Sequence, residues 1–123
     1  MKTVTFDTYA WVEFFSGTKK GERVREYVDG SCVILTPAIA LFELSRKYLR
    51  EGKPFEKSVE FVKTRSKVVP FDSGLAILAS KVAVERKLAA ADAAVYATGI
   101  ATSSAILTGD EHLKGLDCVE FLG

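Results

Sequence analysis

The chain has 123 residues, of which 48% are hydrophobic and 27% are charged, and its formal net charge is +1. This length suits one domain spanning residues 1–123, and the composition is ordinary for a soluble globular protein. No apolar run is long enough to span a membrane, and the first residues lack the apolar core of a signal peptide. We therefore expect a cytoplasmic protein without membrane contact.

Short apolar or β-branched runs alternate with segments that have the apolar spacing of helices. The runs expected to form strands are 4–6, 31–35, 67–70, 105–107 and 118–121. The segments expected to form helices are 9–15, 21–29, 38–51, 55–64, 74–86 and 90–102. Thr36 and Pro37 should open the helix 38–51, with the Thr hydroxyl as its cap and Pro in its first turn. This alternation predicts an α/β fold with a mainly parallel sheet.

The two cysteines, Cys32 and Cys118, fall in apolar, strand-like segments and lack the spacing of a metal site. We expect both to be buried small hydrophobic residues rather than partners in a disulfide or ligands of zinc.

Basic residues are concentrated in one segment of this nearly neutral chain. Residues 46–67 hold eight Lys and Arg but three Glu, a net charge of +5, so the remaining residues carry −4. A basic surface beside an acidic remainder is the pattern expected when one surface meets phosphates and another holds cations. The alternative is a solvated pair of helices with no nucleic-acid partner.

Two acids follow expected strands. Asp7 comes directly after the strand 4–6, and Asp110 follows the strand 105–107 through Thr108 and Gly109. In parallel α/β sheets, functional sites form beyond the carboxyl ends of the strands, so both acids should lie at the same edge. Taken singly, each is more simply explained as the cap of the next helix.

Two further acids interrupt apolar helical segments. Glu43 stands among the apolar residues of 39–44, where the alternative role is an exposed pair with Lys47 one turn later. Asp92 interrupts the small-residue segment 89–97, where the alternative role is the helix N-cap. A buried carboxylate needs a partner, a metal or a cleft, because burying it alone costs several kcal/mol.

Four acids at one edge of a sheet would repel one another unless a cation neutralised them. Ligands that are all oxygens select hard cations, so Mg²⁺ or Mn²⁺ is the expected occupant. The sequence therefore predicts a divalent-metal site.

The segments that contain these acids resemble, in their order, those of the PIN-domain nucleases. They are Asp-Thr-Tyr-Ala-Trp at 7–11, Phe-Glu-Leu at 42–44, Ala-Asp-Ala-Ala-Val-Tyr-Ala-Thr at 91–98 and Leu-Thr-Gly-Asp at 107–110. Within that family the chain is most similar to the VapC toxins of toxin–antitoxin pairs. The resemblance covers essentially the whole chain.

This resemblance implies a three-layer α/β/α sandwich with the four acids in one pocket. It implies that Asp7 and Asp92 are the most direct metal ligands, and that Glu43 and Asp110 complete the cluster, partly through water. Thr108 matches a hydroxyl position of the family and would orient Asp110 or the attacking water.

The resemblance also implies an activity and partners. The activity is metal-dependent hydrolysis of RNA that leaves a 5′-phosphate, and the partners are a cognate antitoxin and a second copy of the chain. Segments 59–62 and 75–84 carry more apolar residues than one face of a small sheet needs, which favours a homodimer. Arg46, Lys47 and Arg50 follow Glu43 on its helix and should bind RNA at the rim of the pocket.

Other functions are less consistent with the sequence. A haloacid-dehalogenase-like phosphatase needs an Asp two residues after the first, where this chain has Tyr9. A metal-free ribonuclease usually needs two histidines, and the chain has one, His112, which we expect to be incidental at a surface turn. A PIN-like scaffold that binds RNA or protein without catalysis is the remaining alternative.

Overall fold

The computed structural model describes residues 2–123 and has a five-stranded sheet at its centre. Each neighbouring pair of strands is parallel, and the spatial order is β3-β2-β1-β4-β5. The strands are β1 (Thr3–Phe6), β2 (Val33–Pro37), β3 (Lys67–Val69), β4 (Ala105–Thr108) and β5 (Val119–Phe121). The expected parallel sheet is therefore confirmed.

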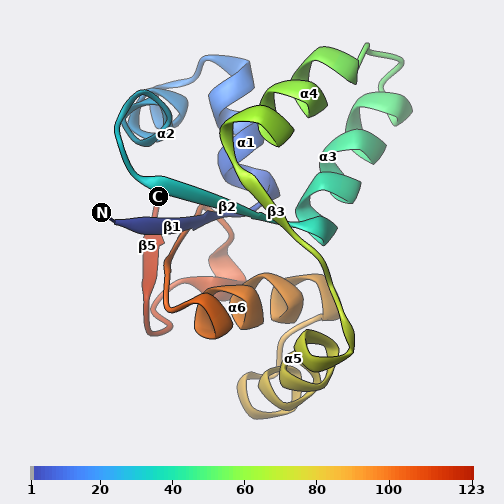
Figure 1. Ribbon diagram of the computed structural model, residues 1–123, viewed down its shortest axis with the longest axis vertical. Helices are drawn as coiled ribbons and strands as arrows, with labels where there is room; N and C mark the ends of the chain where they lie inside the picture. The colour runs from blue at the N-terminus through green and yellow to red at the C-terminus, as the bar shows by residue number, and fades with distance from the viewer. Residues whose placement is uncertain (1) are drawn as a thin grey trace.

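Helices cover both faces of the sheet, which gives the expected three-layer α/β/α arrangement (Figure 1). Helices α1 to α4 lie on one side, and α5 and α6 lie on the other (Figure 1). The helices are α1 (Thr8–Ser16), α2 (Lys19–Asp29), α3 (Ala38–Arg50), α4 (Glu56–Arg65), α5 (Ser73–Arg86) and α6 (Ala90–Thr102), with a short 3-10 helix η1 (Glu111–Leu113). Within residues 2–123, none of these helices is long and apolar enough to cross a membrane.

The start of α3 differs from the sequence-based expectation. Thr36 and Pro37 belong to β2, and α3 begins at Ala38 without a side-chain cap. The residue before a proline favours extended backbone, and the Thr36 hydroxyl is occupied by Trp11 and Ser66, to which it lies at 3.0 and 2.7 Å. The prediction that Thr36 caps this helix was wrong because tertiary partners use its hydroxyl.

The expectation of two buried cysteines was also wrong. Cys32 is half-buried and Cys118 is exposed, and both are free. Cys118 has φ +66° and precedes β5 instead of lying inside it. This left-handed turn residue lies outside the sheet, where its side chain meets solvent.

Two features of the core position the site. The residues 93–99 of α6 are all buried between the sheet and α5, which explains why this helix is built from small residues. On the other face, Trp11 is fully buried and packs against Phe6, Phe14 and Phe15. Both helices that carry these residues, α1 and α6, are thereby fixed against the central strands.

The order of the strands creates a switch point between β1 and β4. From β1 the chain extends the sheet in one direction through β2 and β3, and then returns to add β4 and β5 on the other side. The loops after β1 and β4 therefore diverge at the carboxyl edge of the sheet, where α/β folds form their binding sites.

Candidate active site

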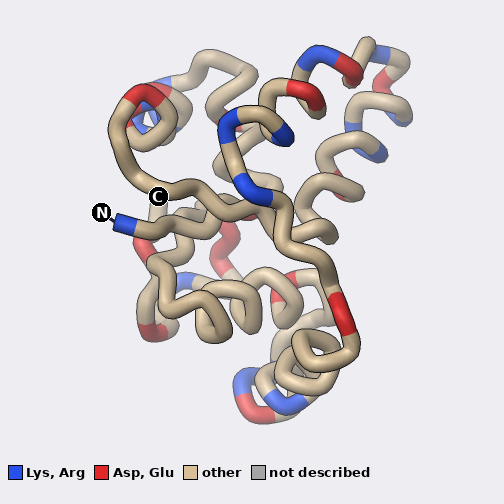
Figure 2. The backbone as a smooth tube through the Cα atoms, in the orientation of Figure 1, with Lys and Arg blue, Asp and Glu red and all other residues tan. Residues whose placement is uncertain are grey.

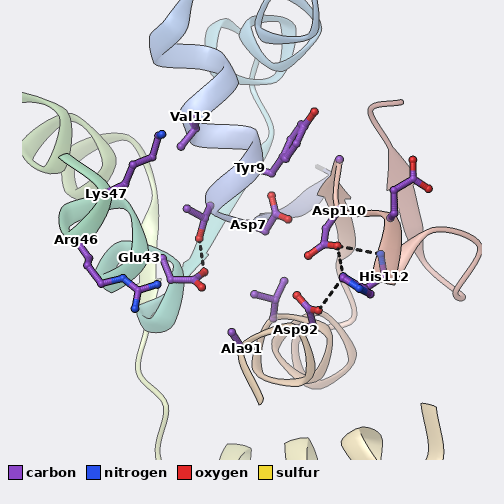
Figure 3. Close-up of a pocket in the computed structure, with 14 residues that line it drawn as sticks. Asp7, Tyr9, Val12, Glu43, Arg46, Lys47, Ala91, Asp92, Asp110 and His112 are labelled. Atoms are coloured by element: carbon purple, nitrogen blue, oxygen red, sulfur yellow. Dashed lines mark hydrogen bonds and ion pairs between the residues drawn. The ribbon is translucent and has the colours of Figure 1, made fainter. Parts of the chain in front are cut away.

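A cavity of about 610 Å³ opens at this switch point. Asp7, Glu43, Asp92 and Asp110 all line it, although they come from four separate segments of the chain. In Figure 3 their carboxylates face one another across the cavity. The structure thus brings together all four acids that the sequence singled out.

Asp7 follows β1 and caps α1. Its Oδ1 accepts the backbone N–H of Ala10 at 2.9 Å, and its Oδ2 accepts the hydroxyl of Thr108. The side chain is buried, at 6% exposure, and burial raises the pKa of the Asp7 carboxyl to about 7. This value includes a smaller rise from the negative charges of Asp110 and Glu43 and a lowering by the two hydrogen bonds.

Glu43 lies on α3 and points into the cavity (Figure 3). Its Oε1 accepts the hydroxyl of Thr8 at 2.7 Å, so the residue beside Asp7 holds the second acid in position. Lys47 instead donates to Glu51 at 2.6 Å. The alternative of a surface pair between Glu43 and Lys47 is therefore excluded.

Asp92 lies in the first turn of α6, whose N-cap is Ala89. The alternative that Asp92 caps this helix is thus wrong, and its carboxylate faces the cavity. The pKa of Asp92 is raised to about 6, chiefly by burial and also by its hydrogen bond with Asp110 and the charge of that residue. These two carboxyls share a proton most readily when no cation lies between them.

Asp110 reaches the cavity from the loop after β4. The hydroxyl of Thr108 accepts the backbone N–H of Asp110 at 2.9 Å, so one threonine holds both Asp7 and Asp110. Gly109 allows this tight passage, since a Cβ there would overlap the ring of Tyr9. Burial raises the pKa of Asp110, but the amide of His112 and the hydrogen bond with Asp92 outweigh it and hold the value below its usual range.

His112 is the residue of this cavity that the sequence analysis missed. Its side chain is 78% exposed, as expected for a surface turn, yet it lines the cavity. The ring Nδ1 lies 2.9 Å from an oxygen of Asp110 and 3.7 Å from an oxygen of Asp92 (Figure 3). Its position two residues after Asp110, at the start of a helical turn capped by that acid, was the available signal.

Two of the three expected rim cations lie at the cavity. Arg46 and Lys47 line it, whereas Arg50 lies one turn further along α3, in a separate apolar groove. Figure 2 shows that basic residues continue from α3 along α4 to the start of β3. Positive charge thus borders the acidic cavity on one side.

The side chains in the cavity fit a divalent cation. Carboxylate oxygens are the donors that hard divalent ions select, and four of these groups meet here. One oxygen each from Asp92 and Asp110 and a ring nitrogen of His112 lie within 4.8 Å of one another. A cation among these groups would also relieve the repulsion that adds to the effect of burial on the pKa of Asp7 and Asp92.

The model of the PIN-domain family matches residues 4–117 of the chain. The chain belongs to the PIN-domain family. The acids described above therefore lie in a PIN domain, as the order of their segments indicated. A comparison with curated proteins gives no match.

Several solved structures share this PIN fold. A toxin–antitoxin complex from Klebsiella pneumoniae is 17% identical, with a TM-score of 0.83 and 98% of each chain covered. The DNA-bound VapBC complex from Salmonella typhimurium is 18% identical, with a TM-score of 0.75 over 100% of each chain. The sarcin–ricin-loop-cleaving toxin VapC20 from Mycobacterium tuberculosis is 18% identical, with a TM-score of 0.64, over 82% of this chain and 84% of that one. At these identities the likeness establishes the fold alone.

Proposed function

We propose that the protein is a metal-dependent ribonuclease that hydrolyses RNA phosphodiester bonds with Mg²⁺ or Mn²⁺. The observation that carries this proposal is the meeting of four carboxylates in one open cavity with Arg46 and Lys47 at its border. Such a cavity suits a reaction in which a cation is held by acids while basic side chains hold a phosphate backbone. Family membership supports the same reaction class.

When bound, a divalent cation supplies an acidified water as the nucleophile and positive charge against the phosphodiester. In this proposal Asp7, Glu43, Asp92 and Asp110 hold the cation, and the products carry a 5′-phosphate and a 3′-hydroxyl.

Thr8 and Thr108 orient these acids. The hydroxyl of Thr108 has a single proton, which it donates to Asp7, and the side chain is fully buried. Thr108 therefore acts as a positioning residue and not as a donor to the attacking water.

We further propose that the protein is the toxin of a type II toxin–antitoxin pair, acts in the cytoplasm and forms a homodimer. The support is the similarity in fold to proteins described as toxins and as toxin–antitoxin complexes. Induction of the wild-type chain in a bacterial host should arrest growth, and induction of Asp7→Asn should not. The product of the adjacent reading frame should relieve the arrest when it is expressed together with the wild-type chain.

A cleavage assay with restored metal tests the proposed reaction. The protein is stripped with EDTA, supplied with Mg²⁺ or Mn²⁺, and incubated with a panel of structured RNAs whose product ends are identified by mass spectrometry. We expect cleavage by the wild type and by Asp29→Asn, an exposed acid on α2. We expect none by Asp92→Asn or Glu43→Gln, nor by the wild type in EDTA.

Three results would contradict the proposal. RNA binding without cleavage under every metal condition would favour the scaffold without catalysis. Cleavage that persists in EDTA, or products that end in a 2′,3′-cyclic phosphate, would point to a reaction in which the RNA 2′-hydroxyl attacks instead of water.

A further inference from the structure

The proposed function leaves open which side chains set the choice of metal. An all-carboxylate cavity offers oxygen donors alone, which suits Mg²⁺. This cavity also offers an imidazole, because His112 turns its ring toward the carboxylates of Asp92 and Asp110 (Figure 3). A neutral imidazole nitrogen is a better ligand for first-row transition ions than for Mg²⁺.

The distances around the ring match those between neighbouring ligands of one ion. Two adjacent ligands of an octahedral ion, each roughly 2.1 Å from it, lie about 3 Å apart. The Nδ1 atom lies 2.9 Å from Asp110 Oδ1 and 3.7 Å from Asp92 Oδ2. All three donor atoms lie within 4.8 Å of one another, so a single ion can contact them after small rotations of the side chains.

The backbone places His112 near these acids. The carboxylate of Asp110 accepts the backbone N–H of His112 at 2.9 Å and caps the helical turn Glu111–Leu113. Leu113, the next residue, is 1% exposed and anchors this turn in the core. The backbone therefore holds His112 beside the site, and its ring nitrogen lies close to both carboxylates.

We propose that His112 is a direct nitrogen ligand of the cation held by Asp92 and Asp110, and that it gives the site a preference for transition ions over Mg²⁺. The proposal rests on the proposed function for the presence of the cation. The present proposal goes beyond the proposed function because it adds a nitrogen ligand to the four carboxylates. His112 acts here as a metal ligand and not as an acid or base.

The chain offers a clean test because His112 is its single histidine. In protein freed of any purification tag, imidazole ¹⁴N coupling to bound Mn²⁺ in pulsed electron paramagnetic resonance must come from this residue. We expect that coupling in the wild type and its loss in His112→Ala. The side chain is 78% exposed, so its removal leaves the core intact.

Metal affinities provide the second readout. We expect His112→Ala to weaken Mn²⁺ and Co²⁺ binding by roughly tenfold or more, with a much smaller change for Mg²⁺. The matched control is Glu111→Gln, which removes a charge from the neighbouring residue of the same cavity. This control should retain the nitrogen coupling and change the affinities for all three ions alike.

The results separate this inference from the proposed function. The nitrogen ligand would be overturned by tight Mn²⁺ binding without imidazole coupling. It would also be overturned if His112→Ala lost Mg²⁺ and Mn²⁺ affinity equally. Neither result would contradict the proposed cleavage of RNA. Clear coupling in a protein that cleaves no RNA would uphold the ligand and overturn the ribonuclease. Failure of the wild type to bind any of the three ions would overturn both.

Discussion

Asp7 serves the fold and the site with the same carboxylate. One oxygen caps α1 through the amide of Ala10, and the other accepts the hydroxyl of Thr108 from β4. Asn and Asp are about equally good N-caps, so an amide here keeps the helix start while it removes the charge. Substitution of Asp7 by Asn therefore separates its role as a helix cap from its role as a charged group of the site.

Asp7→Asn should abolish RNA cleavage and stabilise the metal-free protein at neutral pH. The pKa of the carboxyl is about 7 in the folded protein and near 3.8 without the fold, so the folded state binds more protons between these values. The free energy of unfolding of the wild type must then fall as the pH rises through this window. The stability gain of the variant should be absent below about pH 4 and reach on the order of a few kcal/mol above about pH 7.

Urea unfolding in EDTA at acidic and neutral pH measures this difference, with Asp29→Asn as the exposed control. Equal pH dependence of the two proteins would show that Asp7 carries no buried charge. Cleavage by Asp7→Asn at the wild-type rate would show that Asp7 is no part of the metal site.

Thr108 connects two of the four acids through one hydroxyl. It donates to Asp7 and accepts the amide of Asp110, and its side chain is fully buried. The hydrogen bond to Asp7 lowers the pKa of that carboxyl against the larger effect of burial. Removal of the hydroxyl should therefore raise the pKa of Asp7 further and release the loop that carries Asp110.

Thr108→Val should reduce cleavage by roughly tenfold or more and move the acidic limb of the pH–rate profile to higher pH. Thr108→Ser keeps the hydroxyl and should restore both the rate and the profile. A purely structural role would lower the rate of Thr108→Val without moving its pH profile. That outcome would contradict the coupling between Thr108 and Asp7.

At the scale of elements, α3 carries both an acid of the site and the cations beside it. Glu43 faces the cavity, and Arg46 and Lys47 follow within about one turn and line the same cavity. Arg46 lies over the ring of Phe42, 5.4 Å from its centre, while Lys47 pairs with Glu51. Of these two cations, Lys47 is paired with a carboxylate, whereas Arg46 has no carboxylate partner within salt-bridge distance among residues 2–123.

Combining Arg46→Ala with Lys47→Ala should weaken RNA binding about equally for all sequences. Each phosphate contact removed should lower the slope of log affinity against log salt by about 0.7 for single-stranded RNA. Arg50→Ala should have a smaller effect because Arg50 does not line the cavity. The assay is RNA binding by the Asp92→Asn protein in a series of salt concentrations, which avoids cleavage.

Lys19→Ala, at the exposed start of α2 and outside the cavity, is the control for loss of a cation elsewhere on the molecule. An unchanged affinity and salt slope in the double variant would mean that the basic surface of 46–67 is solvated and does not meet RNA.

The elements show what sequence patterns can predict in this chain. The ends of β1 and β4 and the small-residue helix α6 followed from local spacing, and with them the positions of Asp7, Asp110 and Asp92. These predictions succeeded because strand ends and small-residue helices constrain a chain through its own backbone. The predictions from local spacing gave the position of the cavity, but they did not give the hydrogen bonds between its side chains.

Side-chain contacts between segments far apart in the chain could not be predicted from the sequence. Lys47 lies one turn from both Glu43 and Glu51 on the same helix. It pairs with Glu51, because Glu43 is held by the hydroxyl of Thr8 from another helix. Likewise, Thr36 failed as a cap because its hydroxyl bonds with Trp11 and Ser66. Each outcome depends on a partner about 25 residues away or more, which no local pattern encodes.

At the scale of the whole molecule, apolar side chains remain exposed on two helices. On α5, Ile77 is 60% exposed and Val84 is 80% exposed, while the opposite face packs on α6. On α3, Phe42 and Leu49 are 57% and 61% exposed beside a groove of about 700 Å³. The segment 59–62, expected to be available for dimer contacts, is largely used within the chain, since Val62 is fully buried and Phe61 stacks on Phe14.

We expect α5 to lie in the interface of a homodimer, since Ile77 and Val84 are two turns apart on one face of the helix. Exposed apolar residues grouped in this way are typical of protein interfaces. Replacing both residues by Lys would bring like charges together across a two-fold interface, and the protein should then be a monomer at micromolar concentration. Val33→Lys, which also replaces an exposed apolar residue but at the start of β2, should leave the dimer intact. Light scattering coupled to size-exclusion chromatography measures the mass of each protein, and a monomeric wild type at that concentration would rule out this interface.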